Sequence, residues 1–89
     1  MRLIFQPSAQ HNADTYREHD AVLWAELQKV LVAIRDQAPR ARETRLDVLG
    51  GTAWLINVRI PGRDEAYQVV WAASDADVAD IVHLGPQLG

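Results

Sequence analysis

The chain has 89 residues, of which 48% are hydrophobic, and its formal net charge is −3. A chain of this length makes one small domain, residues 1–89, that buries roughly 60–65% of the surface its unfolded form exposes. It has no cysteine, which excludes a disulfide scaffold and a thiolate metal site. The negative charge argues against broad attraction to nucleic acid, because that attraction needs many Lys and Arg side chains to neutralise phosphates.

The amino-terminal residues MRLIFQP hold an apolar run of only three residues, too short for the core of a signal peptide. Nowhere do about 18 apolar residues follow one another, as a membrane-spanning helix requires. We therefore expect a soluble protein without membrane contact, and the cytoplasm is its default location.

The first half of the chain reads as a short strand followed by helices. The run Leu3–Phe5 predicts a strand that Pro7 closes, because proline has no N–H to donate to a ladder. Residues 9–37 contain no Gly or Pro, and Asp20 is a suitable N-cap, so we predict a short helix near 9–18 and a long one near 20–37. One continuous helix is the alternative. The long helix shows one apolar stripe at helical spacing: Leu23, Leu27, Val30, Leu31 and Ile34.

After the connector PRARETR the apolar period changes from 3.6 to 2. RLDV, AWLINVRI, AYQVVWAA and VADIVHL read as strands, separated by the turns GG, PGRDE and SDAD. The predicted order is β-α-α-β-β-β-β. The fold class is α+β, with a short amino-terminal strand and a helical hairpin packed on an antiparallel sheet of three to four strands. The tryptophans Trp24, Trp54 and Trp71 are predicted to belong to the core.

This order, together with the segments QAPR, RLDVLGG, AWLINVRI and AYQVVWAASDADVADIVHLG, resembles the RelE/ParE superfamily, from about Ala21 to Leu84. These proteins are the toxin halves of bacterial type II toxin–antitoxin pairs. The resemblance implies a cognate antitoxin as partner. It also implies a target that is either mRNA on the ribosome, which an endoribonuclease cuts, or DNA gyrase, which a relative blocks. In the nuclease branch, basic side chains on the sheet stabilise the negative charge that builds up as a phosphodiester is displaced.

The basic positions of the nuclease branch are largely replaced in this chain. The family tends to place basic side chains on its first long strand, where this sequence has Leu55 and Asn57. An arginine usually follows the aromatic residue of the next strand, and here that position is Gln68. Asparagine and glutamine can hold a phosphate by hydrogen bonds, but they do not offset its charge. The loss of cations fits the gyrase-blocking branch slightly better.

The remaining candidates define the predicted site. Arg59, Arg63 and His83 are the predicted catalytic residues, since arginines bind phosphate and a histidine ring titrates near working pH. Arg45, Asn57 and Gln68 are the predicted substrate-binding residues. The competing interpretation is a solvated hairpin, in which Asp64 and Glu65 are local counter-charges of the two arginines, and a histidine that is only a polar surface residue.

No metal or cofactor is expected, because His11 and His19 lie eight residues apart and no His-Glu-x-x-His spacing occurs. The second functional hypothesis is a catalytically silent protein-binding domain on the same scaffold, and a homodimer stays open under it.

Overall fold

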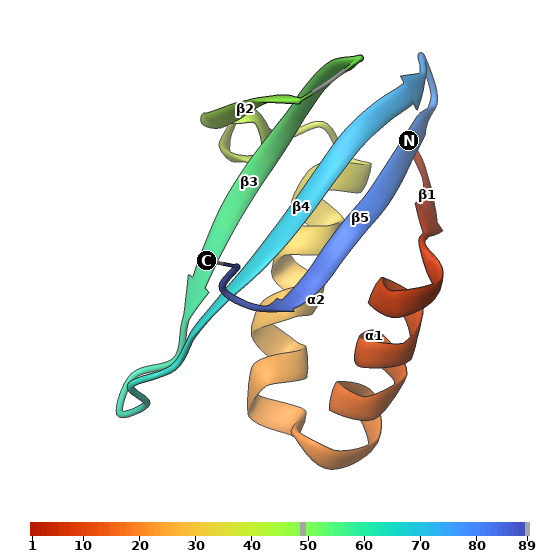
Figure 1. Ribbon diagram of the computed structural model, residues 1–89. Helices are drawn as coiled ribbons and strands as arrows, with labels where there is room; N and C mark the ends of the chain where they lie inside the picture. Colours follow the sequence, from red (N-terminus) through yellow and green to blue (C-terminus); the bar gives the residue numbers. More distant parts are fainter. Residues whose placement is uncertain (49, 89) are drawn as a thin grey trace.

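In the computed structural model, which describes residues 1–48 and 50–88, a helical hairpin packs on one face of a five-stranded sheet (Figure 1). The predicted α+β class and the order β-α-α-β-β-β-β are confirmed. The sheet is larger than the predicted three to four strands, because the amino-terminal strand joins it. It is therefore mixed, since that strand runs parallel to its neighbour.

The two helices are α1 (Pro7–His19) and α2 (Ala21–Arg35). Asp20 separates them with a non-helical backbone and caps α2, its carboxylate accepting a hydrogen bond from the Leu23 N–H at 3.2 Å. This cap explains why the chain forms a hairpin and not one continuous helix. The second helix ends two residues earlier than predicted, and Gln37 just beyond it has a left-handed backbone (φ 56°).

The strands are β1 (Arg2–Phe5), β2 (Thr44–Val48), β3 (Gly51–Arg59), β4 (Ala66–Asp75) and β5 (Val78–Pro86), and a short 3-10 turn, η1 (Pro39–Arg42), precedes β2. Their order across the sheet is β1-β5-β4-β3-β2, and all pairs except β1–β5 are antiparallel. The first and last strands of the chain are thus neighbours, and β1 and β2 form the two edges.

The core lies between the sheet and the helices, and Trp71 of β4 is at its centre with no exposed surface. Its indole N–H donates to the Ala41 carbonyl of η1 at 2.9 Å. Its ring stacks on Trp54 with centroids 4.7 Å apart, and the Arg42 guanidinium lies 5.1 Å from its centroid. The largest other fully buried side chains are Leu23, Leu27, Val30, Ile34, Val69, Ile81 and Leu84.

A polar contact fastens α1 to β5. The Asn12 side-chain amide donates to the Leu84 carbonyl at 2.8 Å, and it lies so close to Gly85 that a Cβ at that position would be 2.8 Å from the amide nitrogen. The close approach of helix and strand therefore depends on a glycine at position 85.

Candidate functional site: the open face of the sheet

The helices cover one face of the sheet (Figure 1), and the strand registers place most of the predicted site residues on the opposite face. On β3, Ile56 and Val58 are buried against the helices, so Leu55, Asn57 and Arg59 point the other way. The strand registers extend this alternation to the neighbouring strands. We call this surface the open face; its side chains include Arg2, Ile4, Thr44, Leu46, Val48, Ala53, Leu55, Asn57, Arg59, Ala66, Gln68, Val70, Ala72, Asp80 and His83.

Two neutral amides occupy the middle of the open face. Asn57 and Gln68 are opposite each other in the β3–β4 register, and the Gln68 Nε2 donates to the Asn57 Oδ1 at 3.3 Å. The Gln68 Oε1 accepts from the backbone N–H of Leu88 at 3.1 Å, so the chain beyond β5 turns back over this residue. Gln68 is only 6% exposed. Its amide is therefore largely used within the protein, while Asn57 stays exposed.

His83 lies on the same face, opposite Val70 in the next register position. Its Nε2 is 2.9 Å from the Pro86 carbonyl oxygen, which can only accept, so this ring nitrogen carries the proton. The other ring nitrogen, Nδ1, makes no hydrogen bond with residues 1–48 or 50–88, so only one side of the ring is held by the backbone.

The predicted arginines do not gather at one point. Arg59 is exposed at the end of β3 on the open face, and its side chain makes no hydrogen bond or ion pair with residues 1–48 or 50–88. Arg45 is opposite Trp54, which places it on the helix-side face, where its Nε donates to Asp47 at 3.0 Å. The structure therefore brings Arg59, Asn57, Gln68 and His83 to one face and leaves Arg45 and Arg63 outside it.

Arg63 belongs to a contact between the β3–β4 turn and the helical hairpin. Its two terminal nitrogens donate to the Asp20 carboxylate at 2.7 and 2.9 Å, in a bidentate pair whose side chains are about one third exposed or less. The hydrogen bond from Arg63 lowers the pKa of Asp20 below its usual range, and the same bond raises the pKa of Arg63. The expected counter-charges Asp64 and Glu65 do not fill this role for Arg63, because the carboxylate that caps α2 does.

An apolar groove between β1 and the two helices was not predicted. It has a volume of about 320 Å³, and we call it the helix groove. Its apolar lining consists of Leu3, Phe5, Ala13, Trp24, Leu31 and Val32, and its polar rim consists of Gln10, Asp14, Arg17, Gln28 and Arg35. The sequence held a partial signal, since Trp24, Leu31 and Val32 fall on one side of α2 while α1 offers only the small Ala13 opposite them.

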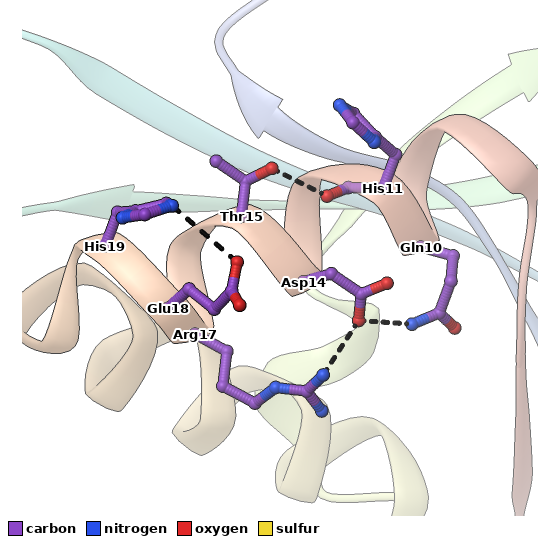
Figure 2. A network of polar contacts seen from close by, with 7 residues as sticks. All are labelled: Gln10, His11, Asp14, Thr15, Arg17, Glu18 and His19. Carbon is purple, nitrogen blue, oxygen red and sulfur yellow. Dashed lines mark hydrogen bonds and ion pairs between the residues drawn. The ribbon is translucent and has the colours of Figure 1, made fainter.

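One rim of the helix groove is an internally paired polar network on α1 (Figure 2). Asp14 accepts hydrogen bonds from Gln10 at 3.0 Å and from Arg17 at 3.1 Å. On the same helix, His19 lies 3.6 Å from Glu18. No group of three His, Cys, Asp or Glu side chains in the described part of the chain is arranged to hold a metal ion.

No protein-family model matches the chain, and neither the curated proteins nor the solved structures contain a match to it. Within residues 1–48 and 50–88, none of the helices has the length and apolar character needed to cross a membrane.

The chemistry available on the open face is limited. Arg59, His83 and the exposed amide of Asn57 can hold an anionic group, and Arg40 borders the hollow that Leu55 and Asn57 line. Strong stabilisation of a transition state with developing negative charge depends on several fixed donors or cations around the same atoms. Among the apolar side chains of the open face, Val48 is exposed and Leu55 is partly exposed, whereas Ala53 and Val70 are buried.

Proposed function

We propose that the protein is a toxin-like component of a type II toxin–antitoxin pair that acts by binding a protein target, with DNA gyrase as the first target to test. A cognate antitoxin would hold it inactive. The proposal starts from the resemblance to the RelE/ParE superfamily, and the order β-α-α-β-β-β-β with a helical hairpin on an antiparallel meander is the arrangement that this resemblance implies.

One observation carries the choice of binding over RNA cleavage. The centre of the open face holds an amide pair, Asn57 and Gln68, flanked by apolar side chains, and Arg59 lies at its end. Apolar area with a few polar groups favours contact with a protein surface, whereas binding of an RNA backbone depends on clustered positive charge. The net charge of −3 points in the same direction.

The test is to express the chain without a partner in bacteria and to measure growth, plasmid supercoiling and cleavage of mRNA on ribosomes. We expect growth arrest with impaired gyrase activity and intact mRNA. The variant Arg59→Ala is compared with Arg45→Ala, which also removes an exposed arginine but from the helix-side face. The binding mode would be refuted if the chain cleaves mRNA on ribosomes, and if Arg59→Ala abolishes this cleavage while Arg45→Ala leaves it unchanged. The endoribonuclease would then be the better hypothesis, with His83 as its proton-transfer group.

A second candidate function is a non-enzymatic binding domain on the same scaffold. The helix groove favours it, because an apolar groove that contains a half-buried tryptophan is a surface that protein partners use. Unchanged growth, gyrase activity and mRNA on expression would select this candidate.

A further inference from the structure

On the outer edge of β1, the backbone groups of Leu3 and Phe5 have no hydrogen-bond partner among residues 1–48 and 50–88. The N–H groups of Arg2 and Gln6 donate to the carbonyls of Asp77 and Ile81, on the β5 side. In a parallel ladder alternate residues face the neighbouring strand, so the N–H and C=O groups of Leu3 and Phe5 point away from β5. Because β1 is the edge of the sheet, these groups face no other strand (Figure 1).

The same two residues line the helix groove with their side chains. Leu3 is opposite Ala79 and Phe5 is opposite Ile81, both of which are fully buried, so both side chains point to the helix side of the sheet. Leu3 and Phe5 therefore present free backbone groups along the sheet edge, and their side chains form part of the apolar lining of the adjacent helix groove.

The charges around the groove indicate which side chain it accepts. On the rim, Arg17 is paired with Asp14 at 3.1 Å and Arg35 with Asp36 at 3.0 Å. The positive charges of the rim are therefore balanced by neighbouring carboxylates. A neutral apolar side chain matches this lining, since a charged one would lose water without gaining a partner. Arg2, in contrast, is exposed and forms no ion pair with residues 1–48 or 50–88.

We infer that the edge of β1 and the helix groove form one binding site for an extended segment of a partner protein. The segment adds as a sixth strand beside β1, its backbone bonding to Leu3 and Phe5, and it inserts one bulky apolar side chain into the groove. A carboxylate of the segment lies beside Arg2 as a cross-strand partner. In such strand addition the main chain supplies affinity, and the pockets for alternate side chains supply specificity.

This site lies at the β1 edge, away from Asn57 and Arg59 on β3, and does not depend on which target the open face binds. An added strand lies about 4.8 Å from β1, so its side chains on the helix side would reach the mouth of the groove. A strand here would also cover Phe5 and Trp24, two large aromatic side chains that the protein leaves only partly buried.

The test uses a capped eight-residue peptide of alternating threonine and valine with one central leucine and a terminal glutamate. The matched control peptide has serine in place of the leucine. Amide hydrogen exchange of the full chain is followed by NMR with each peptide. We expect the leucine peptide to slow exchange at the amides of Leu3 and Phe5, with little change at Arg2, whose amide already donates to the Asp77 carbonyl. We expect the serine peptide to bind at least about tenfold more weakly.

Two exposed valines of α2 supply matched variants. Val32 is 43% exposed and lines the groove, whereas Val22 is 58% exposed and does not. We expect Val32→Glu to weaken binding of the leucine peptide about tenfold, and Val22→Glu to leave it within about twofold. The inference is overturned if both variants bind equally well, or if Leu3 and Phe5 gain no protection. It is also overturned if the free chain proves to be a dimer that Val32→Glu dissociates, because a second copy then occupies the groove.

Discussion

Replacing Trp71 by phenylalanine tests whether the tryptophan pair and η1 form one structural unit. The substitution removes the indole N–H that donates to the Ala41 carbonyl, and Ala41 is only 1% exposed. A buried acceptor without a donor lowers the free energy of unfolding by about 1–3 kcal/mol. The smaller ring adds roughly 1–2 kcal/mol of lost packing at a site with no exposed surface. The total of about 2–5 kcal/mol compares with a free energy of unfolding of roughly 4–13 kcal/mol for a domain of this length.

The measurement is urea unfolding followed by circular dichroism, with Trp54→Phe as the control. Trp54 stacks on the same ring but is only partly buried, and its indole makes no hydrogen bond within residues 1–48 and 50–88. We expect it to lose about 1 kcal/mol when truncated. If the two variants lose the same free energy, the hydrogen bond to η1 contributes nothing measurable and the reasoning fails.

Three further outcomes are expected. Gly85→Ala should cost about 1–3 kcal/mol by displacing the amide that fastens α1 to β5, whereas Gly51→Ala, with open space around its Cβ, should stay within about 0.5 kcal/mol in the same unfolding assay. The hydrogen bond from Arg63 lowers the folded-state pKa of Asp20, so the ionised carboxylate stabilises the fold above about pH 4, and this stabilisation is lost as the pH falls through the lowered value. In Asp20→Asn, the free energy of unfolding should therefore fall less between about pH 5 and pH 2 than in the unchanged protein. An equal fall in both proteins would contradict this assignment. Arg63→Ala should lower the thermal midpoint while Arg59→Ala leaves it nearly unchanged, and equal shifts would mean that the contact with the helical hairpin is not stabilising.

Local patterns in the sequence were sufficient for the class of fold. The change from a period of 3.6 to a period of 2 separates the helical half from the sheet, and the carboxylate of Asp20 marks the break between the helices because a cap acts within three residues. The face of each strand also follows from alternation, which correctly placed Asn57 and Arg59 on one side of β3 and Ile56 on the other.

Contacts between segments that are far apart in the sequence could not be predicted from such local patterns. A strand's periodicity gives the face of each residue but not the neighbouring strand, so the parallel pairing of β1 with β5 was missed. The partner of Arg63 lies 43 residues away in the sequence, and nearby acidic residues were the natural but incorrect expectation. The helix groove combines side chains from three elements, and no single stretch of sequence contains it.

The parallel pairing of β1 and β5 has a consequence for how the protein is made. Arg2 is aligned with Val78, so the first strand emerges from the ribosome long before its neighbour is translated. The helical hairpin can assemble early from local contacts, but the edge strand must wait until β5 has been synthesised, and such distant pairings slow folding.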